Sequence, residues 1–209
     1  MKIKLFIIII MKNFDKYKLN QEEWNLLLTL PLYFTTGIVW ADEISNPEEY
    51  RPFWRWLAGT ASSGNQIEND IAINLQDMSD SGVNIFDFQY DIREKYDLFI
   101  TDENNERSGV DYKKQGHLLG EIINKLDESI IYPLLTDMKW LSYQVAIAYG
   151  VPDEPMSDSE KEMWWKLFRY LNRAINDYGV DEQDETNEVI DDKSSSVNKN
   201  KNEGEAGFV

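Results

Sequence analysis

An uncharged stretch near the start of the chain limits the fold more than any other feature of the sequence. Residues 25–41 contain no Asp, Glu, Lys or Arg. A helix on the surface of a globular protein shows a polar face over such a length, and this stretch has almost none. We therefore expect a buried central helix over residues 20–42, around which the other helices pack.

The flanking residues support a helix. Asn20 is a favourable N-cap, and Glu23 stands three residues later, as in a capping box. Pro31 lies inside the pattern and removes one backbone N–H. We expect it to kink the helix or to divide it in two.

A membrane-spanning helix is the alternative interpretation of the same stretch. A span needs about 20 apolar residues, whereas this run has 17 and includes Pro31, Thr35 and Thr36. Acidic residues flank it on both sides, where basic anchors are usual. These features favour a buried helix and predict no membrane association.

The net charge restricts the partners. At 209 residues the chain has room for one ordinary domain and a tail, and its formal charge is −17. Such a surface repels phosphate backbones, so we expect no nucleic-acid partner. It would attract a basic protein or divalent cations, although acidity also simply keeps a protein soluble. The chain has no cysteine, which excludes disulfides and thiolate sites and fits the cytoplasmic location that we expect.

Residues 1–19 form a separate N-terminal segment in this interpretation. Two lysines precede the apolar run of residues 5–10, as at the start of a signal peptide. The run is at the lower length limit, and no small-residue cleavage site follows it. Translation from Met11, or a short apolar segment attached to the domain, is favoured over export.

Apolar residues recur at helical spacing through residues 20–180. This pattern predicts an all-α, single-domain bundle of five to seven helices. Beyond the central helix, the predicted helices start at about residues 47, 67, 110, 131 and 158. The last of them has the clearest start, because Ser157 to Glu160 matches a capping box. Residues 140–152 carry no charge and are expected to belong to a second buried helix.

Three other stretches lie between these helices. Residues 59–64, with the sequence GTASSG, are expected to be a loop, and residues 102–109 a polar loop and the most flexible point of the domain. Residues 83–100 fit a strand by alternation and a helix by three- and four-residue spacing. Their helical surroundings favour a helix.

The composition changes after Gly179. Residues 181–209 contain nine acidic residues and three lysines, with few large apolar groups. Such a segment cannot bury enough apolar surface to fold alone, so we expect a disordered acidic tail that is dispensable for folding. Without its charge of −6, residues 1–180 still carry −11.

The first predicted helical pair resembles the tellurite-resistance TerB-like helical proteins. In both, an Ala-Asp pair at a helix end, here Ala41-Asp42, precedes a short loop and a helix capped by acids, here Glu48 and Glu49. The resemblance covers about 30 residues and implies an all-helical fold. It also implies that Asp42 with Glu48 or Glu49 takes part in binding a metal. The glycine-containing loop of that family is replaced here by residues 43–46.

The inventory of reactive side chains is short. His117 is the only histidine, and no serine motif adjoins it, so we interpret it as a partly exposed structural residue without a catalytic role. Zinc sites built from His and Cys are excluded, while an oxygen-only site for Mg²⁺ or Ca²⁺ stays open. The acids of residues 77–82 and the pair Asp153-Glu154 lack EF-hand spacing, and no metal ligands can be named. Through-space carboxylate pairs of the glycosidase type are invisible in the sequence.

Six of the tryptophans fall into two groups according to their positions on the predicted helices. Trp24, Trp40, Trp54 and Trp164 fall on predicted core stripes, whereas Trp56 and Trp165 adjoin core positions and can point outward. Exposed aromatics of this kind mark a protein-binding patch or cover the edge of the core, and the second is the commoner case.

These observations predict a non-enzymatic interaction or scaffold module that needs no cofactor. A protein is the expected partner, with basic proteins among the candidates. A TerB-like module that binds a divalent metal or a small ligand is the alternative. An acidic inhibitor that imitates nucleic acid is a third. The oligomeric state does not follow from the sequence.

Overall fold

The computed structural model describes residues 14–41, 46–63, 65–102, 106–148 and 156–175. All of these belong to one compact unit. The other unit, residues 177–209, lies outside the described residues, and so do residues 1–13, on which the expectations for the N-terminal run fall. No described helix combines the length and the apolar character that crossing a membrane would require.

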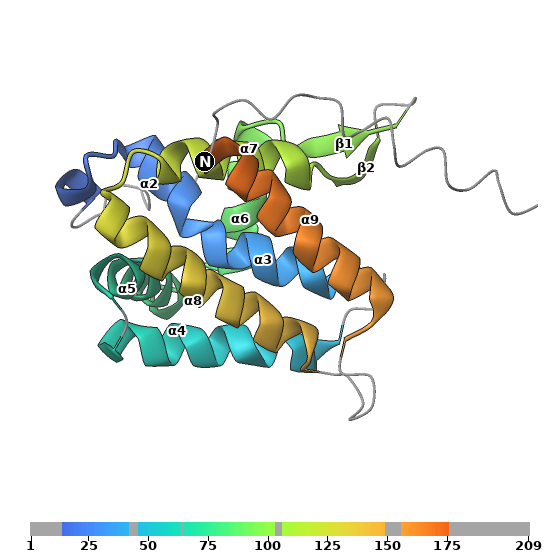
Figure 1. The fold of residues 1–209 in the computed structure, drawn as a ribbon, viewed down its shortest axis with the longest axis horizontal. Helices are drawn as coiled ribbons and strands as arrows, with labels where there is room; N and C mark the ends of the chain where they lie inside the picture. The colour runs from blue at the N-terminus through green and yellow to red at the C-terminus, as the bar shows by residue number, and fades with distance from the viewer. Residues whose placement is uncertain (1–13, 42–45, 64, 103–105, 149–155, 176–209) are drawn as a thin grey trace, which may run out of the picture. The chain divides into compact units, whose positions relative to one another are not determined.

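The described residues form helices and one small hairpin (Figure 1). In chain order the elements are η1 (Phe14–Tyr17), α2 (Gln21–Leu28), α3 (Leu30–Val39), η2 (Pro47–Tyr50), α4 (Arg51–Ser63), α5 (Gln66–Asp80), α6 (Ile85–Lys95), β1 (Phe99–Thr101), β2 (Arg107–Val110), α7 (Tyr112–Ile123), α8 (Glu128–Ala146) and α9 (Asp158–Ile175). With α2 and α3 taken as two halves of one helix, the described part has seven helices. The prediction of an all-α bundle of five to seven helices is confirmed.

The predicted central helix is present and is divided in two. Asn20 accepts hydrogen bonds from the backbone N–H groups of Glu22 and Glu23, and the Glu23 side chain accepts from the Asn20 N–H at 2.8 Å. The division falls at Thr29, which ends α2, and Pro31 stands in the first turn of α3. A backbone N–H in the first turn of a helix has no intrahelical partner. Proline, which lacks this group, therefore costs no hydrogen bond where the helix restarts.

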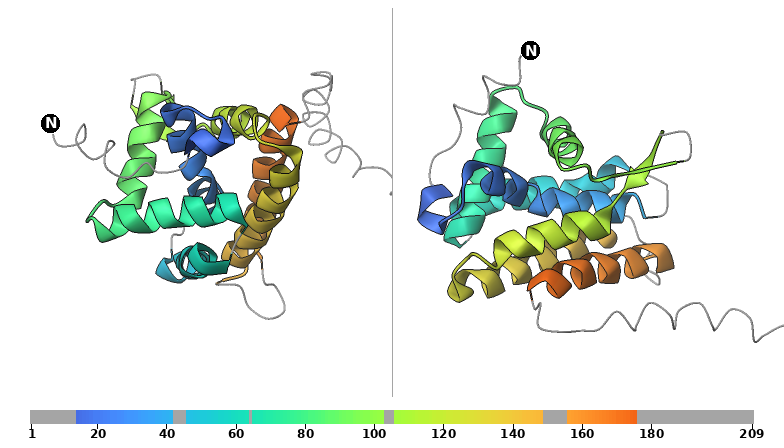
Figure 2. Two further views of the ribbon diagram at one scale, coloured as in Figure 1. Left: turned by 90° about the vertical axis from the view of Figure 1, so that its left-hand side faces the viewer. Right: turned by 90° about the horizontal axis from the view of Figure 1, so that it is seen from above.

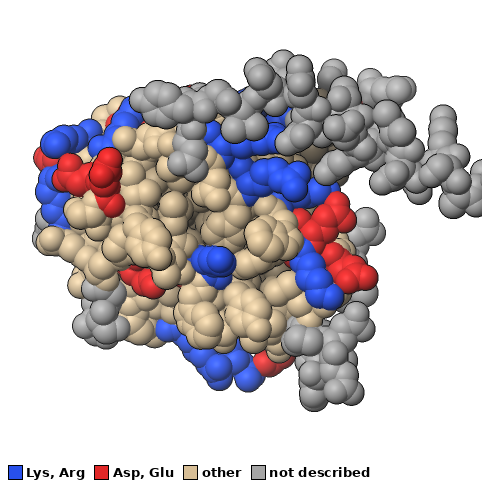
Figure 3. Space-filling view, in the orientation of Figure 1, with Lys and Arg blue, Asp and Glu red and all other residues tan. Residues whose placement is uncertain are grey.

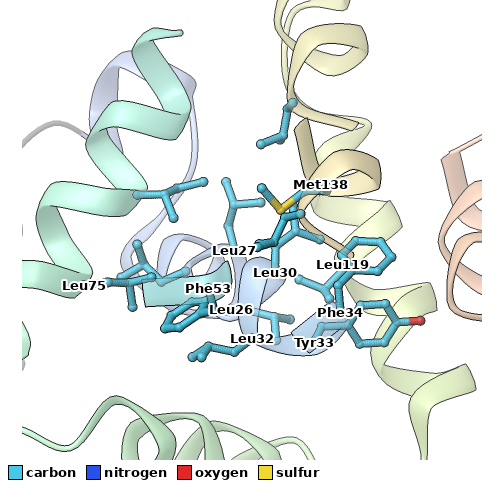
Figure 4. Packing of buried hydrophobic residues seen from close by; sticks show 14 of the residues in the cluster. Leu26, Leu27, Leu30, Leu32, Tyr33, Phe34, Phe53, Leu75, Leu119 and Met138 are labelled. Atoms are coloured by element: carbon cyan, nitrogen blue, oxygen red, sulfur yellow. The ribbon is translucent and has the colours of Figure 1, made fainter. Parts of the chain in front are cut away.

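Helices α2 and α3 fill the middle of the core. Every residue of α3 is buried, and α2 is buried from Trp24 to Leu28. Figure 4 shows their side chains directed outward on several sides. They meet Phe53 of α4, Leu75 of α5, Leu119 of α7 and Met138 of α8. A helix that is apolar all round is stable only when it is enclosed in this way.

Helices α7 and α9 make the closest helix pair, and the views of Figures 1 and 2 place them side by side. Two glycines of α7 allow this approach. A Cβ atom on Gly120 would lie 2.8 Å from the Leu171 carbonyl oxygen and would also collide with Ala174. A Cβ atom on Gly116 would lie 2.6 Å from the Tyr33 hydroxyl oxygen.

Three local expectations are corrected. Residues 59–63 are not a loop but the last turns of α4, where Thr60 is buried and the Leu57 carbonyl oxygen accepts a hydrogen bond from Gln76 of α5 at 2.9 Å. This packing of α4 against α5 outweighs the poor helix propensity of Gly59.

The segment between α5 and α7 is helical first and extended afterwards. Residues 85–95 form α6, as the helical surroundings favoured. The strands β1 and β2 then pair antiparallel, so residues 107–109 belong to a hairpin, not to the polar loop that the composition predicted, and Val110 precedes α7. Figure 2 shows the hairpin at the edge of the helices. Arg107 fixes it to α6 through Glu94, at 2.5 Å, and through the Tyr90 hydroxyl.

Helix α8 is only partly the buried helix that its lack of charge predicted. Leu141, Ser142 and Val145 are buried, but Trp140 is 62% exposed and Tyr143 is 39% exposed. An absence of charge does not distinguish core positions from a surface covered by aromatic rings.

The capping box predicted for the next helix is present, because Glu160 accepts from the Ser157 N–H at 2.7 Å and the Ser157 Oγ accepts from the Glu160 N–H.

Candidate functional site

The acids that the TerB-like resemblance implies as ligands have helix-capping roles where they are described. Asp42 lies outside the described residues. Glu49 is buried, and its carboxylate accepts a hydrogen bond from the Asn46 N–H at the start of η2. Glu48 forms an ion pair with Arg51 at 2.6 Å. Both carboxylates therefore stabilise this helix start.

The other sequence candidates do not come together. Asp77 and Asp80 are exposed near the end of α5, and residues 153–154 are outside the described part. Within the described ranges, no group of three or more His, Asp or Glu side chains is placed to hold a metal ion.

His117 lies in the middle of α7 with its side chain 53% exposed. Its Nε2 atom is 3.4 Å from a carboxylate oxygen of Glu121, one helical turn later. The exposed position agrees with the interpretation from the sequence. A catalytic role is neither supported nor tested by this geometry.

The tryptophans differ from the prediction at two positions. Trp24 is fully buried as expected, and Trp164 is half-buried. Trp40 and Trp54, however, are large exposed side chains. Trp40 follows the last residue of α3, beyond the point where the helix is enclosed. Trp54 lies edge-on against Phe53 and Phe86 at the rim of the core, and the residue stays 42% exposed.

Helices α8 and α9 each carry a pair of contacting aromatic rings, and three of these four rings are exposed. We define the aromatic surface as Lys139, Trp140, Tyr143, Trp164 and Trp165. On α8, the rings of Trp140 and Tyr143 stack with their centroids 6.1 Å apart. On α9, Trp164 and Trp165 meet edge to face at 5.0 Å.

Trp164 connects the two helices. Its indole N–H donates to the Ser142 hydroxyl at 2.8 Å, which fixes the ring against α8. Its ring also packs on Phe168, whose own ring stacks on Phe34 of the central helix at 4.5 Å. The inner part of the aromatic surface is thus anchored to the core, while Trp165, at 62% exposed, faces solvent.

A lysine lies within this aromatic surface. The Lys139 ammonium is 5.7 Å from the centre of the Trp164 ring, within the range of a cation–π contact. Figure 3 shows the side of the molecule on which α8 and α9 lie. This side is mainly uncharged, with Lys and Arg inside it and acidic groups toward its margins. For a chain with 38 acidic residues, this is an unusual part of the surface.

Two carboxyl groups lie next to each other where α5 and α8 meet. Glu68 of α5 is fully buried, and one of its oxygens accepts a hydrogen bond from the Asn65 side chain. Asp137 of α8 lies beside the Glu68 carboxyl. Burial, together with a hydrogen bond and the negative charge of Asp137, raises the pKa of Glu68 from 4.5 to about 9. Glu68 is therefore protonated at neutral pH, beside the Asp137 side chain.

A buried arginine lies at the opposite side of the core. Arg93 of α6 donates from Nη2 to Thr36 Oγ1 at 2.9 Å and from Nε to Gln115 Oε1 at 3.1 Å. Its guanidinium stands over the Tyr112 ring, 5.3 Å from the centroid. Burial lowers the pKa of Arg93, and Tyr112 and Tyr33 oppose that shift. No carboxylate of the described residues forms an ion pair with it. These hydrogen bonds join α6 to α3 and α7.

The sequence could have indicated the aromatic surface only in part. Trp165 was expected to point outward, and it does. Trp140 and Tyr143 were missed because they fall in the uncharged stretch that was expected to be buried. Glu68 and Asp137 are far apart in the chain, and no sequence pattern links them.

Comparisons of this chain with protein-family models, with curated proteins and with solved structures find no match. The resemblance to TerB-like proteins therefore stays a prediction.

Proposed function

We propose that this chain is a non-enzymatic protein-interaction module, which binds a partner protein through the aromatic surface. The observation that carries the proposal is the exposure of Trp140, Tyr143 and Trp165 on two helices that the Trp164–Ser142 hydrogen bond joins. Aromatic side chains are enriched at protein interfaces, where Trp and Tyr are among the residues that give most of the binding free energy.

The rigidity of the surface supports the proposal. Trp164 is held by Ser142 and by Phe168, so the rings lie on two helices that are fixed to the core. A preorganised surface loses little side-chain entropy when a partner binds. The proposal that the chain is non-enzymatic rests on its reactive side chains, which include neither a thiol nor a second histidine for general acid–base catalysis.

Affinity capture from an extract of the native host tests this proposal. The immobilised full chain is compared with a Trp140→Ser, Trp165→Ser double variant. Since both side chains are mostly exposed, we expect the variant to fold with a thermal midpoint within a few degrees of the wild type. Ile100→Ser, at a position 51% exposed on the β-hairpin, is the matched control.

The expected result is one protein that the wild type and Ile100→Ser retain in similar amount and that the double variant loses at least tenfold, measured by quantitative mass spectrometry. Equal retention by all three chains would show that the aromatic surface is not the binding surface.

The alternative function, binding of a divalent metal or small ligand, is separated by a second measurement. Ligands that bind the folded state raise the thermal midpoint in proportion to the logarithm of their concentration. Titration with Ca²⁺ and Mg²⁺ should leave the midpoint unchanged for an interaction module. A rise that grows with the logarithm of the metal concentration, and that Asp42→Asn or Glu48→Gln abolishes, would favour the TerB-like alternative.

A further inference from the structure

The charge within the aromatic surface is opposite in sign to the net charge of the chain. Lys139 is exposed, and no carboxylate among the described residues lies within 4 Å of its ammonium. Its position over the Trp164 ring keeps the cation at the surface of the aromatic rings. A cation held in this way is available to a partner and has already lost part of its hydration.

The acidic side chains of α8 and α9 do not neutralise this lysine. Asp137 lies toward α5 beside Glu68, and Glu160 is buried as a capping residue. Asp158 pairs with Lys161 at 3.1 Å, and Glu162 pairs with Lys166 at 2.5 Å. Glu128, in the first turn of α8, is 11 residues before Lys139, or about 16 Å along the helix axis.

Helix α9 also becomes basic along its length. All of its acids lie at or before Glu162, whereas Lys166, Arg169 and Arg173 follow. Arg169 and Arg173 are exposed. At physiological ionic strength the Debye length is about 8 Å. A group that approaches Lys139 is therefore influenced mainly by charges within about this distance and much less by acids elsewhere on the molecule.

We infer that the partner segment bound by the aromatic surface carries a carboxylate side chain flanked by large apolar side chains. The carboxylate pairs with Lys139, and the apolar side chains cover Trp140 and Trp165. This inference rests on the proposed function and adds the chemistry of the partner. Complementary charge at an interface sets the orientation of the partner and excludes segments of the wrong sign.

Single-stranded nucleic acid is the other anion that binds aromatic rings beside cations. A carboxylate on an apolar segment is favoured here for an electrostatic reason. A polynucleotide brings one charge per nucleotide along its length, and it would extend from the few cations of this surface over a chain of net charge −17. A short segment with one carboxylate can pair with Lys139 without extending over the acidic remainder of the chain.

The test uses the full chain and synthetic peptides. The probe is a 14-residue amphipathic peptide with Leu and Phe on one face around a central Glu, and its counterpart has Gln at that position. A third peptide has Lys there, and a thymidine oligonucleotide is the phosphate probe. Binding is measured by NMR from the indole N–H signals of Trp140 and Trp165, at 50 mM salt.

We expect the Glu peptide to shift these signals and to bind at least fivefold more tightly than the Gln peptide. Lys139→Glu should reverse the order, so that the Lys peptide binds best. Lys95→Ala is the matched control, because Lys95 is an exposed lysine on α6 whose ion pair with Glu22 contributes little to stability. It should leave the order of the peptides unchanged.

Equal binding of the Glu and Gln peptides would overturn the inference and leave the proposed function standing, since a peptide would still cover the indoles. Tighter binding of the oligonucleotide at the same indoles would overturn it in favour of phosphate. Absence of any shift would overturn it as well, and the capture experiment would then decide on the proposed function independently.

Discussion

Arg93 on α6 and Glu68 on α5 are both withdrawn from solvent, at 8% and 0% exposed, in the same helical unit. Arg93 keeps its charge, because a guanidinium cannot be deprotonated near neutral pH, and neutral acceptors on Thr36 and Gln115 replace its water. Glu68, by contrast, does not keep its charge, since it takes up a proton and becomes neutral beside Asp137. Burial of a charge is thus balanced by hydrogen bonds in one region and by protonation in the other.

This difference predicts different responses to pH. Hydrogen bonds to a permanently charged group contribute the same stability at any pH at which the acceptors are unchanged. A protonated carboxyl contributes stability that depends on pH, and replacing each of the two side chains tests this contrast.

The largest effect is expected for Arg93→Met. The substitution removes two hydrogen bonds and leaves the Gln115 Oε1 acceptor buried without a donor. We expect the free energy of unfolding to fall by about 3 kcal/mol, by nearly the same amount at pH 5 and at pH 9. Urea denaturation at both pH values measures it. Arg93→Lys, which keeps the charge but not the planar fork, should be destabilised too. A loss that disappears at one end of this range would show that a titrating group pairs with Arg93.

The next effect is a gain, for Glu68→Gln. The folded-state pKa of Glu68, about 9, lies above its ordinary value of 4.5, so the folded state binds the extra proton. Its contribution to stability is complete below about pH 4.5 and is lost as the pH rises toward 9. Glutamine needs no proton and still offers a donor to Asp137.

Glu68→Gln should therefore be close to neutral at pH 5 and stabilising by about 2 kcal/mol at a pH of about 6.5. The difference between the two chains isolates Glu68, because all other carboxylates are common to both. A difference that stays constant from pH 5 to pH 9 would contradict the assignment of a protonated Glu68.

Thr36→Val is expected to have a smaller effect. It removes the hydroxyl that accepts from Arg93 at 2.9 Å and from Gln89 at 3.4 Å, while keeping the branched shape of the side chain. We expect a loss of about 1 kcal/mol. Thr35→Val is the matched control, because the Thr35 hydroxyl is equally buried and bonds only to the Pro31 carbonyl of its own helix. Equal losses for the two variants would mean that Thr36 is not a significant acceptor for Arg93.

The smallest effect is expected for His117→Gln. Histidine is the side-chain type that ordinarily titrates near neutrality, within the pH range in which Glu68 should act. Because His117 is exposed and lies beside the exposed Glu121 of its own helix, its replacement should change stability by less than about 0.5 kcal/mol. The decrease of stability between pH 5 and pH 9 should persist. A flattened pH profile in this variant would assign that decrease to His117 and not to Glu68.

Local sequence signals predicted the parts of the fold that local chemistry decides. The Asn20 and Ser157 caps, the break at Pro31 and the enclosure of α3 follow from residues that are neighbours in the chain. Gly59 and Trp54 show where this reasoning ends. Gly59 is helical because α4 packs on α5, and Trp54 is exposed because its helix lies at the rim of the core. Both depend on contacts between distant segments.

The candidate site was predictable only as far as single residues allow. Trp165 next to Trp164 indicated an outward ring, but the contact of Trp164 with Ser142 and Lys139 joins two helices across the fold. The pairing of Glu68 with Asp137 arises in the same way. Periodicity assigns a residue to one side of its own helix, and it contains no information about the neighbouring helix that covers that side.

The two glycines of α7 also supply a criterion by which other chains can be recognised as sharing this fold. The Leu171 carbonyl oxygen and Ala174 occupy the space that a Cβ atom would need at Gly120, and the Tyr33 hydroxyl occupies it at Gly116. A chain with this helix arrangement needs residues without bulk at both positions, four apart, and a small residue facing the second of them. Surface residues, by contrast, are free to change. In an alignment of candidate relatives, these small residues should therefore be retained after overall sequence identity has been lost. Their spacing on the two helices would then indicate the same fold.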